Sequence, residues 1–142
     1  MNGFRLESCC CWTATACLMF LMAGCGKGTS PDRPDLADVT GIVTLDGLPL
    51  SEAVVTFQPA DRHPSIGRTD SEGRYELYYM PDTQGGVIGP NQVMVTTRQD
   101  GEDDDPASNI PERIPAQYNA QTTLSADVVK GRNEFNFDLT SK

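Results

Sequence analysis

Apolar and polar residues alternate along most of the chain from about Val39 onward. The alternation is clear in VTGIVTL, residues 39–45, where every second residue is apolar or glycine. The same period of two recurs in four later segments, 53–59, 91–98, 122–129 and 134–139. This period is typical of a strand that buries one face. No window keeps a 3.6-residue apolar period, so we expect no long helix.

Turn signals separate these segments and predict how they connect. Asp46-Gly47 is a strong turn signal, and Pro59 is expected to end its strand. In SIGRTDSEGRYELYY, residues 65–79, the stretch Asp70–Gly73 predicts a hairpin, because aspartate accepts hydrogen bonds from the following backbone and glycine adopts positive φ. About seven short strands over roughly 100 residues predict an all-β fold, a small antiparallel β-sandwich.

The residues expected to face inward are mostly valines, leucines and aromatic residues. They are Val39, Gly41, Val43, Leu45, Val55, Phe57, Tyr75, Leu77, Tyr79, Val93, Val95, Thr97, Leu124, Ala126, Val128, Phe135, Phe137 and Leu139. In the last segment, EFNFDL, the three polar residues between them are expected to face outward. Truncation of Phe137 should therefore be costly and truncation of Asn136 cheap.

The front of the chain has a different pattern, an apolar stretch that ends abruptly. Residues 9–23, CCCWTATACLMFLMA, form a run of about 15 residues behind a short polar head with Arg5 and Glu7. A membrane-spanning helix needs roughly 20 apolar residues, whereas a signal peptide core has about this length. The run predicts a signal peptide, with an uncleaved anchor helix or a secretory signal cut elsewhere as alternatives.

At the end of this run stands Met22-Ala23-Gly24-Cys25, which resembles the lipobox of bacterial lipoproteins. The resemblance implies that residues 1–24 are removed and that the Cys25 thiol carries a diacylglyceryl group. Two acyl chains hold a protein stably on a membrane, whereas one gives only marginal binding. Residues 25–37, rich in glycine and proline, would then be a flexible tether. We expect a body anchored in the cell envelope through the lipid on Cys25, facing outside the cytoplasm.

Two blocks of the body, VTGIVTLDGLPLSEAVVTFQP and GRTDSEGRYEL, share a pattern with one known domain type. The residues that match are Gly47, Pro49, Leu50, Ala53, Val55, Phe57, Thr69, Asp70, Gly73, Tyr75 and Leu77. The pattern resembles that of the carboxypeptidase-regulatory-like, transthyretin-like domain, from about Asp38 to Leu139. The resemblance implies one transthyretin-like sandwich domain over residues 38–142. Such domains usually serve as stabilising, spacing or binding modules, and a fold alone does not fix function.

Charge and residue content exclude several classes of function. The formal net charge is −9, from 20 acidic and 11 basic residues, and such a chain repels nucleic acid. The one histidine, His63, stands in an expected loop, and no cysteine follows Cys25. The sequence contains no Ser-His-Asp set, Cys-His pair, metal cluster or phosphate loop. We therefore expect no catalytic residue, no metal site, no cofactor and no enzyme activity.

Two features keep a second function open. The acidic run Asp100–Asp105 offers carboxylates that could bind calcium, although a charged run in a loop is usually only solvated. Tyr78 and Tyr118 are the aromatic residues of the body that could be exposed, as a glycan-binding surface requires. The leading expectation is a non-enzymatic, membrane-anchored lipoprotein, a structural or protein-interaction module with an envelope protein or glycan as partner. The alternative is a calcium- or glycan-binding module.

Overall fold

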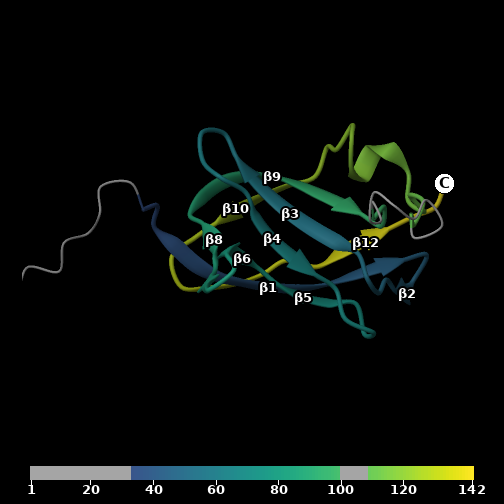
Figure 1. Ribbon diagram of the computed structural model, residues 1–142, viewed down its shortest axis with the longest axis horizontal. Coiled ribbons are helices and arrows are strands. Elements are labelled where there is room, and N and C mark those ends of the chain that lie inside the picture. Colours follow the sequence, from purple (N-terminus) through teal and green to yellow (C-terminus); the bar gives the residue numbers. More distant parts are fainter. Residues whose placement is uncertain (1–32, 100–108) are drawn as a thin grey trace, which may run out of the picture. The chain divides into compact units, whose positions relative to one another are not determined.

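The computed structural model describes residues 33–99 and 109–142, and these residues form two β-sheets packed into a sandwich (Figure 1). The first, which we call the β1 sheet, contains β1 (Leu36–Leu45), β2 (Leu48–Pro49), β5 (Arg74–Glu76), β8 (Gly86–Val87), β11 (Arg132–Glu134) and β12 (Phe137–Leu139). The second, the β9 sheet, contains β3 (Val54–Pro59), β4 (Ser65–Arg68), β6 (Tyr78–Met80), β7 (Thr83–Gln84), β9 (Gly89–Thr96) and β10 (Ser125–Val128). The predicted all-β sandwich is confirmed.

The two sheets are organised differently around their longest strands. β1 pairs along one edge with the antiparallel strands β8, β5 and β2, and along the other with β11 and β12, which run parallel to it. Thr40 shows this arrangement, since it lies opposite Glu76 on one side and Glu134 on the other. The β9 sheet has the order β10-β9-β3-β4-β6-β7 and is antiparallel throughout. The parallel pairing of the last strands is the departure from the predicted antiparallel arrangement.

The described residues contain twelve strands, whereas the sequence predicts about seven. The long alternating segments form strands as predicted, and β1 and β9 have ten and eight residues. The additional strands are short, and β2, β7 and β8 have two residues each. A two-residue strand is too short to show alternation, so the sequence pattern could not reveal it.

The core lies between the inward faces, at the positions that the alternation predicts. Val39 and Val43 of β1 and Val55, Val93 and Val95 of the β9 sheet are completely buried. Each such side chain contributes about 1.5–3 kcal/mol by leaving water. Tyr79, predicted to face inward, is only half-buried and lies outside this core.

Four aromatic rings form one cluster within the core. The ring of Phe57 lies 6.5 Å from that of Tyr75, 5.8 Å from that of Phe135 and 6.3 Å from that of Phe137. Aromatic pairs at such distances contribute about 0.5–1.5 kcal/mol beyond their burial. Phe57 comes from the β9 sheet and the other three rings from the β1 sheet or its interruption, so this cluster joins the two sheets.

The predicted turn at Asp46-Gly47 is confirmed, and in the structure it joins β1 to β2 as a hairpin. Both residues have positive φ, 51° and 80°, and Leu45 pairs with Leu48 across them. Two consecutive positive φ values define the turn that matches the twist of paired strands. Asp46 is further held because its carboxylate accepts a hydrogen bond from the backbone N–H of Ser141 at 3.0 Å.

The prediction of a hairpin over residues 65–79 is correct for the turn and wrong for its two arms. The turn itself forms: the Asp70 carboxylate accepts hydrogen bonds from the backbone N–H groups of Glu72 and Arg74 at 2.8 and 3.0 Å, and Gly73 has a φ of 74°. Past this turn the two arms separate, because β4 pairs with β3 and β6 whereas β5 pairs with β1. The two arms of the expected hairpin therefore belong to different sheets.

The last predicted strand, residues 134–139, is interrupted in the middle. β11 ends at Glu134 and β12 begins at Phe137, and the gap is closed by Asn136, whose Oδ1 accepts a hydrogen bond from the backbone N–H of Ile42 at 2.8 Å. The side chain thus replaces a missing backbone partner of β1. The expectation that Asn136 merely faces solvent is incomplete, since its amide completes the sheet.

A glycine allows this interruption to lie against β1. A Cβ built on Gly41 would lie 1.8 Å from the carbonyl oxygen of Phe135, so no side chain fits there. The same oxygen accepts a hydrogen bond from the Tyr75 hydroxyl at 2.8 Å. Burial raises the pKa of Tyr75, so its hydroxyl stays protonated and remains a donor.

The folded part begins at Leu36, two residues before the domain boundary expected at Asp38. Ala37 pairs with Gly86 and is buried. The described residues contain one short 3-10 helix, Ala116–Tyr118, in agreement with the prediction of no long helix. No helix in residues 33–99 and 109–142 has the length and hydropathy needed to span a bilayer.

Candidate functional site

The two sites that the sequence singles out lie outside the described residues. Cys25, the predicted lipid attachment residue, precedes residue 33, and the acidic run Asp100–Asp105 falls within residues 100–108. Both therefore stay predictions. His63 is described and lies exposed between β3 and β4. Within the described ranges, no group of three His, Cys, Asp or Glu side chains could hold a metal ion.

A groove lies on the folded part where β4 and β5 separate. It has a volume of about 850 Å³ and is lined by residues of both sheets. Its apolar wall includes Ile42 of β1 and Ile66 and Tyr78 of the β9 sheet, all partly exposed. The groove exists because the two arms of the Asp70–Gly73 turn join different sheets.

The floor of the groove is closed by a close approach of backbone. A Cβ on Gly67 of β4 would lie 2.5 Å from the carbonyl oxygen of Glu76, so only glycine allows β4 to come this near to β5. The Asp70–Gly73 turn beside the groove is closed by a hydrogen bond, in which the backbone N–H of Asp70 donates to the carbonyl of Arg74 at 2.9 Å. The groove is thus a surface feature with a closed base and not an opening into the core.

Charged side chains around the groove are held by specific partners. The Glu76 carboxylate accepts hydrogen bonds from the Tyr78 hydroxyl at 2.8 Å and from the Gln84 amide. The hydrogen bond to Glu76, together with its negative charge, raises the pKa of Tyr78. Arg74 pairs with Glu72 at 2.6 Å on the opposite rim. Because these side chains are already fixed, a ligand would need to order few of them.

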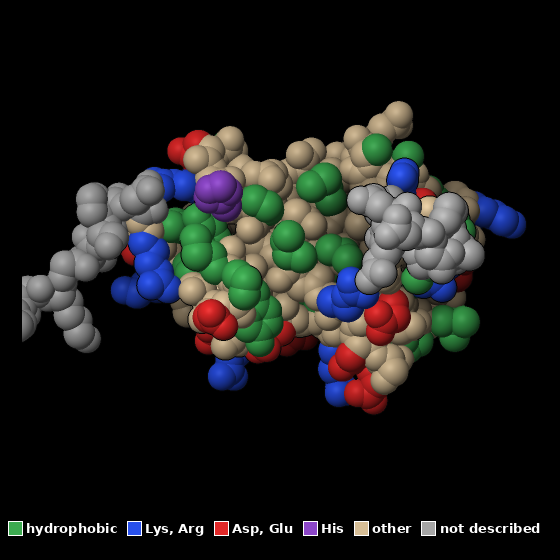
Figure 2. All heavy atoms as spheres, viewed as in Figure 1, with side chains coloured by type: hydrophobic (Ala, Val, Ile, Leu, Met, Phe, Trp, Pro, Cys, Tyr) green, Lys and Arg blue, Asp and Glu red, His purple; other side chains and the backbone are tan. Residues whose placement is uncertain are grey.

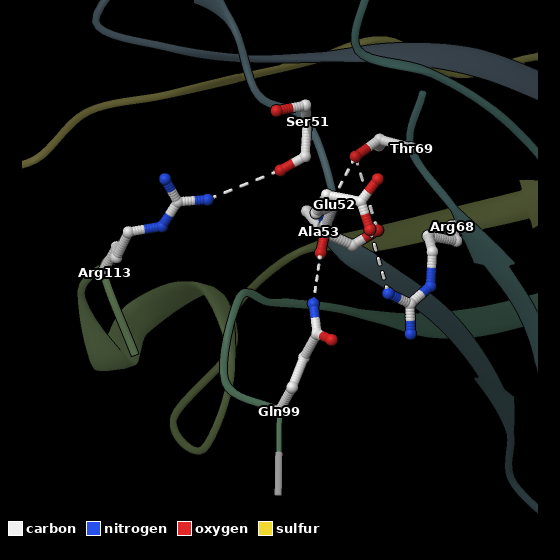
Figure 3. Close-up of polar contacts among 7 residues, drawn as sticks. All are labelled: Ser51, Glu52, Ala53, Arg68, Thr69, Gln99 and Arg113. Carbon is white, nitrogen blue, oxygen red and sulfur yellow. Dashed lines mark hydrogen bonds and ion pairs between the residues drawn. The ribbon is translucent and has the colours of Figure 1, made fainter. Parts of the chain in front are cut away.

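A polar cluster lies at one end of the groove, around the turn between β2 and β3 (Figure 3). Arg68 Nη1 donates to the Glu52 carboxylate at 3.1 Å, and Gln99 Nε2 donates to the Glu52 carbonyl at 3.3 Å. Arg113 Nη2 donates to the carbonyl of Ser51 at 3.4 Å. Glu52 has a φ of 59°, a conformation that few residues other than glycine adopt. The cluster ties Gln99 and Arg113 to this turn.

Glu112 is the most strongly bound carboxylate of the described residues. It accepts hydrogen bonds from the Thr96 hydroxyl, from the Thr97 N–H and hydroxyl at 3.0 and 2.7 Å, and from the Ile114 N–H at 3.3 Å. Partial burial raises the pKa of Glu112, but the hydrogen bonds from Thr96, Thr97 and Ile114 outweigh this and lower it to about 2. One oxygen accepts from Thr97, Arg113 and Ile114 and the other from Thr96, so this carboxylate is a clamp that fixes the end of β9.

Sequence reasoning found neither the groove nor this clamp. Glu112 lies 15 residues from Thr97, and nothing local marks the pairing. The groove depends on which sheet each arm of the turn joins, a choice that alternation does not encode. The candidate aromatic residues differ in placement: Tyr78 is 41% exposed in the groove, whereas Tyr118 is half-buried and bound to Thr140.

No protein family model matches the chain, and no curated protein is similar to it. Among solved structures, a DUF3823 family protein from Parabacteroides merdae is similar, with 16% identity and a TM-score of 0.46 over 77% of this chain and 48% of that protein. A 9R-lipoxygenase from Cyanothece PCC8801 has 18% identity and a TM-score of 0.40 over 74% of this chain and 16% of the enzyme. The chain thus spans about half the length of the first protein and about one sixth of the second. Both similarities concern the β-sandwich alone.

Proposed function

We propose that the protein is an exported lipoprotein whose sandwich acts as a non-enzymatic structural or interaction module at the cell envelope. Residues 1–24 are removed, and the Cys25 thiol carries the lipid. The observation that carries the proposal is the Met22-Ala23-Gly24-Cys25 sequence at the end of the apolar run 9–23. A thiol at the boundary between apolar and polar sequence is the chemistry that lipid attachment requires, and two acyl chains then give stable anchoring.

We also propose that the sandwich is of the carboxypeptidase-regulatory-like, transthyretin-like type. Support comes from the conformations at the matched residues. Gly47 and Gly73 both have positive φ, and the Asp70 side chain holds its turn by two backbone hydrogen bonds. Tyr75, the aromatic residue of the second block, donates its hydroxyl across the β1 sheet. These four matched residues therefore have a conformational or hydrogen-bonding role in the fold.

The groove supports an interaction role for the module. It combines exposed apolar side chains with charged groups already held by partners, and such preorganisation lowers the cost of binding. The ionisable residues of the groove are three carboxylates, two arginines and two tyrosines, and the Tyr78 hydroxyl is already bound to the Glu76 carboxylate. Binding without chemical change is the function that this set of side chains supports best.

Tyr78 favours glycan binding as a second candidate function. Its ring is exposed in the groove beside the Glu76 carboxylate and the Gln84 amide, which could hydrogen-bond sugar hydroxyls. Calorimetric titration with soluble envelope glycans tests this candidate, and titration with calcium tests the acidic run Asp100–Asp105. An absence of heat and of any thermal shift would remove both.

The lipid is tested by substitution of one thiol with a matched control. In the wild-type protein, mass spectrometry should find a chain that begins at Cys25 and carries a lipid, and fractionation should place it with membranes. Cys25→Ser should lose the lipid and leave the membrane fraction or stay unprocessed. Cys17→Ser, a substitution within the apolar run, should behave like wild type. A wild-type chain that is unmodified, or that still begins at Met1, would contradict the proposal.

A further inference from the structure

The outward faces of the two sheets carry different side chains. The charged outward residues of the β1 sheet are Asp38, Arg74, Glu76, Arg132, Glu134 and Asp138. In the β9 sheet, whose strands the structure describes completely, only Arg68 and Asp127 are charged and outward. In a chain with 20 acidic and 11 basic residues, one sheet thus presents a nearly uncharged face.

This face is partly apolar. One row of outward residues crosses five strands in direct cross-strand register: Met94, Thr56, Ile66, Tyr78 and Gln84. Ile66 is 46% exposed, and Met80, on the same strand as Tyr78, is 53% exposed. Figure 2 shows hydrophobic and uncharged polar side chains over the middle of this face, with charged side chains toward its margins. Contiguous exposed apolar residues with a polar rim mark interaction sites.

The two charged residues of the face lie at opposite corners and have opposite signs. Arg68 is on β4 and aligns through Val54 with Thr96, the last residue of β9. Asp127 is on β10 and pairs with Pro90, near the first residue of β9. A two-fold axis in the plane of the face, perpendicular to the line between these corners, would place each Arg68 over Asp127 of a second copy. Arg68 already pairs with Glu52 at 3.1 Å, and this exposed pair lies at the margin of the contact.

The size of the face suits a weak dimer. Its four longer strands, spaced about 4.8 Å apart with about 3.4 Å per residue, and the short β6 give an area on the order of 400 Å² on each copy. Stable interfaces bury about 800 Å² per partner, and weak ones less. The absence of like charges in the middle lets two copies of this acidic chain approach there, whereas the β1 sheet would repel its own copy.

We propose that the protein forms a homodimer through the outward face of the β9 sheet, with the two copies related by a two-fold axis. In such an isologous contact the same residues meet on both sides. The row that includes Ile66 and Tyr78 lies within the contact, to one side of the two-fold axis, and Arg68 and Asp127 meet across the rim. The inference goes beyond the proposed function and does not depend on the lipid.

The test introduces one charge on each outward face and measures self-association of the full chain. Sedimentation of the detergent-purified chain over a hundredfold concentration range should show wild type moving from monomer toward dimer. Ile66→Glu places a like charge from each copy in the contact and should raise the dimer dissociation constant by at least about tenfold. Leu48→Glu, a matched change at a 71% exposed leucine of the β1 sheet that does not line the groove of Ile66 and Tyr78, should dimerise like wild type. Thermal unfolding checks that both variants are folded.

A charge exchange tests the rim contact. Arg68→Glu and Asp127→Arg should each weaken the dimer, and the double variant should recover most of the affinity, because the opposite charges meet again with their positions exchanged. A wild-type chain that stays monomeric over the whole range would overturn the proposal. So would equal association of Ile66→Glu and wild type, which would indicate two chains sharing a micelle. An unlipidated chain that still dimerises would contradict only the proposed lipid anchor, so the two proposals fail separately.

Discussion

The two sheets have similar inward faces and different outward ones. Inside, both sheets present valines and aromatic rings at alternating positions, such as Val43 in one and Val95 in the other. Outside, the β1 sheet is charged along its length, and the β9 sheet carries Arg68 and Asp127 at two corners. The inward pattern is what folding requires of any two-layer protein. Folding does not require the outward faces of the two sheets to differ, so we attribute the difference in charge to what each face contacts.

The sharpest way to probe the shared interior is to remove Phe57, the ring from the β9 sheet that contacts the three rings opposite it. Phe57 is completely buried, so Phe57→Ala should lower the free energy of unfolding by about 3–5 kcal/mol. Urea denaturation measures the loss. Phe137→Ala, in the β1 sheet, removes a ring that is only half-buried and should cost less. Equal costs for the two variants would show that the cluster is not centred on Phe57.

A smaller loss of stability is expected when a buried glycine of each sheet is replaced by alanine. The Cβ of Gly41→Ala would lie 1.8 Å from the Phe135 carbonyl oxygen, whereas that of Gly67→Ala would lie 2.5 Å from the Glu76 carbonyl oxygen. Gly41→Ala should therefore cost about 3 kcal/mol and Gly67→Ala about 1–2 kcal/mol, as overpacking does elsewhere. Chemical denaturation of both variants checks the order. A reversed order would mean that the β1 sheet accommodates the change better than the contact between β4 and β5.

The Glu112 carboxylate at the end of β9 should make the stability of the fold depend on pH. The pKa of Glu112 in the folded protein is about 2, below its ordinary 4.5. This carboxylate therefore stabilises the fold fully above about pH 4.5, and its contribution is lost as the pH falls from 4.5 toward 2. Glu112→Gln should cost about 1–2 kcal/mol at pH 7.

The difference between Glu112→Gln and wild type should shrink as the pH falls toward 2, as followed by urea denaturation at several pH values. Thr97→Val, which removes one donor to the carboxylate, serves as a partial control and should give a smaller loss at pH 7. A gap between Glu112→Gln and wild type that stays constant with pH would contradict the role of the ionised carboxylate.

The smallest expected loss of stability comes from a substitution on the outward side of the β1 sheet. Asn136→Ala removes the acceptor for the Ile42 N–H and should cost about 1 kcal/mol. Asn136→Asp keeps an oxygen acceptor but replaces the 3.1 Å hydrogen bond to Glu134 with a contact between two carboxylates, so it should not recover the loss at pH 7. Hydrogen exchange of the Ile42 amide is the most direct measurement, since it should speed up in the alanine variant. An unchanged exchange rate would show that water replaces the side chain fully.

Alternation and turn chemistry predict much of this fold. The period of two identified β1, β3, β9 and β10, and Asp46-Gly47 predicted its turn, because these features depend on neighbouring residues. The separation of β4 from β5 depends instead on which sheet offers each strand a partner. The parallel pairing of the last strands with β1 joins residues more than 90 apart, such as Ile42 and Asn136, and no local pattern encodes such a pairing.

The candidate site was harder to predict than the fold. Tyr78 was singled out as an aromatic residue that could be exposed, and it lies in the groove as expected of a surface ring. Ile66 looked like an ordinary strand residue, because alternation cannot tell which outward apolar residues are exposed together. Cys25 is predicted as the lipid attachment residue from a few adjacent residues alone, and it lies outside the described part of the chain.

The pairing of β1 with β11 and β12 means that the first and last strands of the folded part depend on each other. When a chain is delivered from its N-terminus, whether from a ribosome or through a membrane pore, β1 emerges early and lacks its partners on one edge until Leu139 arrives. Contacts between residues so far apart in sequence also form slowly. The pairing that closes this edge of the β1 sheet is therefore a late and slow step of folding.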